Sequence, residues 1–378
     1  MRAPREFARI ILLVLRSIPW PNFSAILMPE SSAKSMELPI SGPTGQSIVL
    51  PDRRALPIEF WIVAVFSSVF LVGVHLGLPI NWPDSASFRF VQKHYFSPLL
   101  GAFGLQMALP FLMNRGASSD RWLMLKLLPF VMIVVLLHFN FKAWMPLVNP
   151  RSFDEAFHSL DQWLEPVKQT FVALRTWIAE RVAINVDHAY HGLFVAMFFI
   201  SLALHAGFDK PVRQRQLVMG LCLILLLGGV AYWIAPAVGP FLYGPGCNLA
   251  SQGSQAYMWH QFQGVVQSGQ LPPGYFTAPL AAMPSLHVAH ALFLTMFAFG
   301  SMRWLFLLYL PALGWIVIES VASGWHYLID LPFGAILAIL CFSWARCIVP
   351  AGGAAGMQDR KAISAPAEED SGPENDPV

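Results

Sequence analysis

Two short strings in the C-terminal third of the chain carry the residues best suited to chemistry. They are Pro284-Ser285-Leu286-His287 and His326-Tyr327-Leu328-Ile329-Asp330. His326 and Asp330 are four residues apart at the start of a predicted helix, so their side chains share one face. A carboxylate there holds one imidazole nitrogen as N–H and leaves the other with a free lone pair, as a nucleophilic or basic histidine needs. The alternative is a structural pair that ties two helices together.

The first string predicts an anion site. Pro284 is typical of the first turn of a helix, and Ser285 with the free backbone N–H groups of that turn forms a terminus that binds anions. A phosphate bound there would face both His287 and His326. Taken singly, these residues also fit ordinary helix capping and a buried bundle histidine, so the interpretation depends on whether the chain brings the two strings together.

The chain between the strings is a hydrophobic hairpin, Leu286–Gly300 followed by Trp304–Val321. Such a hairpin crosses a membrane and returns, which places both histidines on the same side. The composition agrees, with 56% hydrophobic and 12% charged residues and a mean hydropathy of +0.53. This excludes an ordinary soluble protein, because so much apolar surface would have no interior to fill.

Runs of about 20 apolar residues span a bilayer, and the sequence predicts about eight of them in an all-α, polytopic membrane helix bundle. The runs are Ile58–Ile80, Phe96–Met113, Trp122–Phe141, Ala189–Gly207, Gln216–Ala235, Leu286–Gly300, Trp304–Val321 and Tyr327–Val349. The predicted division has four parts, and the third contains a six-helix catalytic core. These parts are a cytoplasmic extension (1–56) with a candidate interfacial helix, two accessory transmembrane helices (57–120), a catalytic membrane domain (121–349) and a disordered cytoplasmic tail (350–378).

A segment at about 152–184 predicts interfacial helices rather than a span. Ser152 and Glu155 have the spacing of a capping box, and apolar residues recur at three- and four-residue intervals. Pro166 is expected to divide the segment into two helices. An amphipathic helix here would lie at the lipid interface or cover the bundle, whereas a simple connector is the alternative.

The distribution of basic residues orients the chain. Lys and Arg of short connections stay on the cytoplasmic side, and in an eight-span order one side collects Arg53, Arg54, Arg115, Arg121, Lys210, Arg213, Arg215, Arg303 and Arg346. The opposite side includes Pro236–Met283, which has no charged residue. We therefore expect cytoplasmic termini and an extracytoplasmic site in a plasma or inner membrane. The net charge of +2 points to no particular partner, and no nucleic-acid partner is expected.

A phosphoryl group needs cations or many hydrogen-bond donors in a dry site. The nearest candidate cations are Lys142 and Arg151, for which interfacial snorkelling is the alternative. His188, His191 and His290 could supply metal ligands. No third ligand accompanies His188 and His191 at the spacing of a metal-binding motif. The sequence therefore predicts neither a metal nor a cofactor. The four cysteines predict no disulfide framework.

These motifs resemble the type 2 phosphatidate phosphatase superfamily, which also includes vanadium haloperoxidases. The closest resemblance is to its inositol phosphorylceramide synthase and sphingomyelin synthase branch. The resemblance spans roughly residues 120–350 and depends on the two strings, on Asn140-Phe141-Lys142 with Pro146 and Asn149-Pro150-Arg151, and on Pro236-Ala237-Val238-Gly239-Pro240.

The resemblance implies a phosphohistidine mechanism in which His326 attacks phosphorus, Asp330 orients it and His287 protonates the departing alcohol. Phosphatase members carry Ser-Arg shortly before the nucleophile, where this chain has Glu319 and Ser320. A site with fewer cations favours a phosphodiester substrate over a phosphomonoester. Glu319 and Ser320 at this position therefore favour head-group transfer over dephosphorylation.

The expected partners are a lipid phosphate donor, a water or hydroxyl acceptor and the membrane, with the oligomeric state left open. A lipid phosphate or polyprenyl diphosphate phosphatase is the alternative within the superfamily. A proton-coupled transporter and an inactive scaffold are alternatives from other classes. The transporter is disfavoured because no paired broken helices occur and the ionisable cluster lies near one membrane face.

Overall fold

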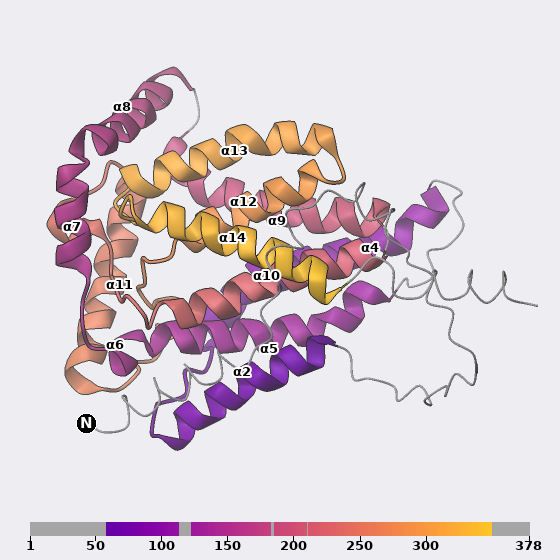
Figure 1. The fold of residues 1–378 in the computed structure, drawn as a ribbon, viewed down its shortest axis with the longest axis horizontal. Helices are drawn as coiled ribbons and strands as arrows, with labels where there is room; N and C mark the ends of the chain where they lie inside the picture. Colours follow the sequence, from indigo (N-terminus) through magenta and orange to yellow (C-terminus); the bar gives the residue numbers. More distant parts are fainter. Residues whose placement is uncertain (1–57, 113–121, 183–184, 210, 350–378) are drawn as a thin grey trace, which may run out of the picture.

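The computed structural model describes residues 58–112, 122–182, 185–209 and 211–349, and within these ranges every regular element is a helix (Figure 1). The predicted N-terminal extension and C-terminal tail lie outside the described residues. The same holds for five of the basic residues used to orient the chain, namely Arg53, Arg54, Arg115, Arg121 and Lys210.

Six described helices are long and apolar enough to cross a membrane, which makes the chain an integral membrane protein. They are α2 (Ile58–His75), α5 (Leu123–Ala143), α9 (Ala189–Phe208), α10 (Pro211–Ala231), α13 (Arg303–Ala322) and α14 (Asp330–Ile348). The all-α membrane bundle predicted from the sequence is confirmed.

Two of the eight predicted spans are not among these six helices. One is α4 (Ser97–Leu112), which has 16 residues but continues without a break from the helical residues 85–96. The other is α12 (Leu286–Phe299), whose 14 residues are shorter than a bilayer. At 1.5 Å per residue α12 is about 21 Å long. It packs against α10, α13 and α14 and is buried over most of its length. Its apolar residues therefore face other helices rather than lipid, which is why a hydropathy scan counts it as a span.

Close contact between α10 and α12 depends on a glycine. A Cβ added at Gly220 would lie 2.2 Å from the Phe293 ring, which is far inside van der Waals contact. The absence of a side chain there lets the two helices pack at short range. Of the six candidate spans, α10 is the most extensively buried, so α10 and α12 form the centre of the bundle.

The remaining helices connect the spans or cover one end of the bundle. They are α3 (Ser85–Val91), the π-helix η3 (Gln92–Phe96), α6 (Met145–Val148), α7 (Asp154–Trp163), α8 (Glu165–Arg181), η4 (Val186–His188), η5 (Pro240–Tyr243), α11 (Leu249–Ser268) and η6 (Tyr275–Thr277). In Figure 1 the helices α7, α8 and α11 lie together at the left end of the bundle. The segment predicted to be interfacial is therefore a cover over one end.

The cover segment breaks into α7 and α8 at Leu164, and Pro166 occupies the first turn of α8. The predicted division into two helices is thus confirmed. The predicted capping box is wrong, because the N-cap residue is Phe153 and its side chain makes no capping hydrogen bond. Ser152 Oγ donates to the Asp154 carboxylate at 2.7 Å and accepts from Asp154 N at 3.2 Å, so both of its hydrogen bonds go to Asp154.

The covered end of the bundle is where the two motif strings meet. The C-terminal ends of α5, α10 and α13 and the N-terminal ends of α9, α12 and α14 all point toward it (Figure 1). Alternating helix direction thus brings residues from six helices to one place, and the cover helices lie over them.

Candidate active site

His326 and Asp330 form the predicted pair, but in a turn rather than on a helix. Helix α14 begins at Asp330, so His326 precedes it. Asp330 Oδ2 lies 3.3 Å from His326 Nδ1 and also accepts a hydrogen bond from Tyr327 N at 2.9 Å. An ionised carboxylate only accepts, so the imidazole donates through Nδ1–H and Nε2 keeps its lone pair. Both side chains are buried.

The second string joins the first through backbone contacts. Ser285 N donates to Asp330 O at 3.2 Å. A Cβ added at Gly334 would lie 2.5 Å from Ser285 O, so α14 packs against the start of α12 backbone to backbone. The ring centroids of His287 and His326 are 6.3 Å apart. The fold therefore brings together the two histidines and the aspartate that the sequence singled out.

Ser285 is the N-cap of α12, where its Oγ accepts from Val288 N at 3.4 Å. Its side chain is buried and does not line the cavity beside His287 and His326. The structure thus shows Ser285 as the cap of α12, and its predicted contact with a phosphate stays a prediction.

A cavity of about 340 Å³ opens beside the two histidines. Its walls are largely apolar and aromatic, and no carboxylate side chain of the described residues lines it. The ionisable nitrogen-bearing side chains that line it are His94, His138, Lys142, His191, His287, His290 and His326. A largely apolar wall with a few convergent polar groups is typical of a small-molecule or substrate site.

Only one of the two predicted cations lies at the cavity. Lys142, in the last turn of α5, lines the cavity, and its Nζ lies 5.7 Å from the centroid of the Tyr232 ring. Arg151 is exposed and is not part of the cavity wall. Within the described residues no carboxylate forms an ion pair with Lys142. Lys142 is therefore the cation available to a bound anion.

Two buried carboxylates of α7, which the sequence analysis did not single out, hold the turn that carries His326. Asp154 accepts hydrogen bonds from Val238 N, Gly239 N and Tyr327 Oη, each at 2.9 Å. Asp161 Oδ1 accepts from Leu328 N at 3.0 Å. Burial raises the pKa of Asp161 to about 6. The signal in the sequence was a pair of aspartates two helical turns apart on an amphipathic helix.

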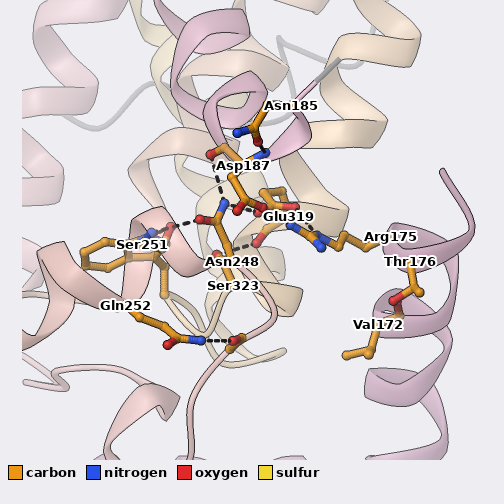
Figure 2. A network of polar contacts seen from close by, with 12 residues as sticks. Val172, Arg175, Thr176, Asn185, Asp187, Asn248, Ser251, Gln252, Glu319 and Ser323 are labelled. Atoms are coloured by element: carbon orange, nitrogen blue, oxygen red, sulfur yellow. Dashed lines mark hydrogen bonds and ion pairs between the residues drawn. The ribbon is translucent and has the colours of Figure 1, made fainter. Parts of the chain in front are cut away.

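Glu319 lies at the centre of a polar network away from the cavity (Figure 2). Its buried carboxylate accepts from Arg175 Nε at 3.3 Å and from Asn248 Nδ2 at 2.6 Å, and Arg175 also pairs with Asp187. The network joins α8, α11 and the start of the α9 segment to α13. Glu319 therefore stabilises the cover and does not face a substrate phosphate.

The end of α13 also supports the nucleophile turn. The carbonyl of Ser320 accepts from His326 N at 3.0 Å. Of the three other histidines weighed as ligands, His191 and His290 line the cavity and His188 does not. In the described part of the chain no three His, Cys, Asp or Glu side chains are arranged to hold a metal ion.

The geometry suits transfer of a phosphoryl group through a histidine. One imidazole has its Nδ1–H held by a carboxylate, the second faces it across a gap, and a lysine stands in the same cavity. No curated protein and no solved structure matches the chain. The family model of the PAP2 superfamily matches residues 155–344, which include His287, His326 and Asp330. Since this match covers half of the chain, the protein belongs to the PAP2 superfamily, whose members are enzymes of the phosphatase and phosphotransferase type.

Proposed function

We propose that the protein is a membrane phosphotransferase that moves a phosphate-linked head group between lipid-associated alcohols through a phosphohistidine on His326. The observation that carries this proposal is the meeting of His326, held by Asp330, with His287 at 6.3 Å between ring centroids. With phosphorus bound between the two imidazoles, His326 would face the phosphorus atom and His287 would face the leaving oxygen on the opposite side. The apolar walls of the cavity suit a lipid-linked substrate.

The first half-reaction forms the intermediate. His326 Nε2 attacks phosphorus, the bond from phosphorus to the leaving oxygen breaks, and protonated His287 gives its proton to that oxygen. Asp330 accepts from the Nδ1–H of His326 and stabilises the positive charge that develops on the ring. In the second half-reaction an acceptor hydroxyl gives its proton to His287 and attacks phosphorus, which frees His326. Lys142 would offset the negative charge on the phosphoryl oxygens.

Transfer of a phosphodiester-linked group fits the charge of the cavity better than hydrolysis of a monoester. The cavity wall carries one lysine, whereas a monoester brings about two negative charges at neutral pH. At the position where phosphatase relatives have Ser-Arg, Glu319 is bound to Arg175 and Asn248 away from the cavity. This favours a reaction like that of inositol phosphorylceramide synthase, with the site on the extracytoplasmic face as the charge distribution suggests.

The test combines variants with product analysis. Purified full-length protein is incubated with a panel of labelled glycerophospholipids, phosphatidate and a polyprenyl diphosphate, and the products are separated by chromatography. We expect His326→Ala, His287→Ala and Asp330→Ala each to lower turnover at least about 100-fold, while His188→Gln, at an exposed site outside the cavity, changes it less than twofold. A labelled protein adduct that is stable in base and labile in acid should form in the wild type and be absent in His326→Ala.

Full turnover in His326→Ala would rule out the proposed mechanism. Release of inorganic phosphate as the main product would instead identify a lipid phosphate or polyprenyl diphosphate phosphatase, with the same residues in the same roles. Coupled uptake of a substrate into vesicles without any transfer or hydrolysis would identify a transporter.

A further inference from the structure

The cavity is completed by a segment outside the residues that match the superfamily. Helix α3 and the π-helix η3 contribute Phe90, His94 and Tyr95 to its wall. Asp84 caps this segment by accepting from Ser87 N at 2.7 Å. A π-helical turn adds a residue to the helix, redirects the side chains that follow, and is frequent at functional sites. The part of the chain predicted to be accessory therefore lies directly at the candidate active site.

His94 of this segment forms a hydrogen bond with His191 of α9. The two Nε2 atoms are 3.1 Å apart, and His94 Nδ1 lies 2.8 Å from the carbonyl oxygen of Phe90. A carbonyl only accepts, so the hydrogen of neutral His94 is on Nδ1 and its Nε2 carries a lone pair. His191 must then donate through Nε2–H, which leaves its own Nδ1 as an acceptor. The contacts thus define one tautomer for each ring.

This pair lies on the same side of the cavity as the candidate acid His287. His191 is followed one turn later on α9 by Phe194, whose ring centroid is 4.6 Å from that of His287. Tyr190, the preceding residue, has its ring centroid 5.0 Å from that of His287. In the proposed reaction His287 exchanges a proton with the oxygen of the leaving or accepting alcohol. The pair therefore stands beside the alcohol rather than beside the nucleophile His326.

The chemistry of the pair favours a neutral hydroxyl. His191 Nδ1 offers a lone pair that would repel an anion and accept from an O–H group. The ring of Phe90, whose centroid is 4.1 Å from that of His94, provides an apolar face for the carbon skeleton of the same group. No carboxylate or cation lies between His94 and His191, because their nitrogen atoms are in direct contact.

We propose that His94 and His191 form a subsite that binds a second hydroxyl of the alcohol reacting at phosphorus, so that the protein selects polyols over simple alcohols. This inference rests on the proposed function and extends it to the class of alcohol that accepts or releases the group at phosphorus. The bond at the subsite is a hydrogen bond from the polyol O–H to His191 Nδ1, with no covalent step.

The experiment is a competition between two acceptors that differ in their hydroxyl groups. Full-length protein in detergent is supplied with the labelled glycerophospholipids of the panel above and with equal concentrations of glycerol and 1-propanol, and the two products are quantified. In the wild type we expect the glycerol product to dominate. In His191→Phe the product ratio should fall about tenfold, the size of effect expected for one hydrogen bond. In His94→Phe the ratio should fall by a smaller factor, because this variant removes the partner that orients His191 and leaves the acceptor Nδ1 in place. His188→Gln, at the same end of α9 but outside the cavity, should leave the ratio unchanged.

A conservative variant separates a binding role from a structural one. In His191→Asn the amide oxygen lies close to the position of Nδ1, so this variant should retain most of the preference for glycerol while His191→Phe loses it. If a Phe variant does not purify as folded protein, His191→Ala makes the same comparison with a smaller side chain.

The outcomes distinguish this inference from the proposed function. An unchanged ratio in His191→Phe overturns the subsite, even if the total rate falls, and so does a wild type that forms no alcohol product or shows no preference. In each of those cases an adduct on His326 would still support the phosphohistidine mechanism. Absence of that adduct in the wild type, with glycerol transfer intact, would overturn the mechanism instead.

Discussion

Replacement of Asp154 tests whether the cover helix holds the nucleophile in place. Asp154 accepts from Val238 N, Gly239 N and Tyr327 Oη, all buried and each at 2.9 Å. Asp154→Ala removes the acceptor for all three. A buried donor left without a partner costs about 1–3 kcal/mol. Three such donors, partly relieved by water entering the space of the lost side chain, predict a loss of about 3 kcal/mol in the free energy of unfolding.

The assay is thermal unfolding of the purified protein in detergent. At about 2–4 °C per kcal/mol, the expected decrease in Tm is on the order of 6–12 °C. Tyr327→Phe removes one of the three donors and leaves no buried donor without an acceptor, so this variant should lower the Tm by much less. Because Tyr327 follows His326 directly, we also expect Asp154→Ala to lower kcat more than it raises KM.

The comparison of the two variants carries the test. If Asp154→Ala unfolds within about 1 °C of the wild type, the three hydrogen bonds do not stabilise the turn and the reasoning is refuted. If it lowers the Tm as much as Tyr327→Phe and no more, the two backbone contacts to Val238 and Gly239 contribute nothing.

Two further predictions concern charge. Lys142→Met should lower kcat/KM about 100-fold, because one cation fewer faces the phosphoryl group, whereas Arg151→Met should leave it within twofold; equal effects of the two would contradict the cavity assignment. Asp161, whose pKa is raised to about 6, keeps its proton in the folded protein between about pH 4 and 6, where the unfolded chain has lost it. This carboxyl therefore contributes stability that is complete below about pH 4 and lost as the pH rises through 6, so Asp161→Asn should flatten the pH dependence of Tm in this range, and an unaltered slope would refute this.

The sequence alone determined the membrane class and the candidate nucleophile set. Hydropathy is a local property, so α2, α5, α9, α10, α13 and α14 could be located from runs of apolar residues. The juxtaposition of His287 and His326 followed from a hairpin that must return to the side from which it left. The sequence predicted the number of membrane spans less well, because a helix buried among other helices, such as α12, is as apolar as a helix that faces lipid.

Tertiary structure decided which polar residues reach the cavity and which only support it. Lys142 and Arg151 are equally basic in the sequence, and only the packing of α5 brings Lys142 to the wall while Arg151 stays exposed. Glu319 looked like a change in the phosphate site, yet it bonds with Arg175, 144 residues away in the chain. Such pairings depend on which helix faces meet, and no local pattern records that.

The same reason explains the contacts that the sequence did not reveal. Asp154 reaches Tyr327 across 173 residues, and His94 meets His191 across 97. Each residue by itself fits an ordinary helix end, since a lone aspartate or histidine on a helix carries no signal of its partner. Only the assembled bundle, which gathers distant helix ends around one cavity, turns these residues into a support for the nucleophile and a candidate subsite for the alcohol.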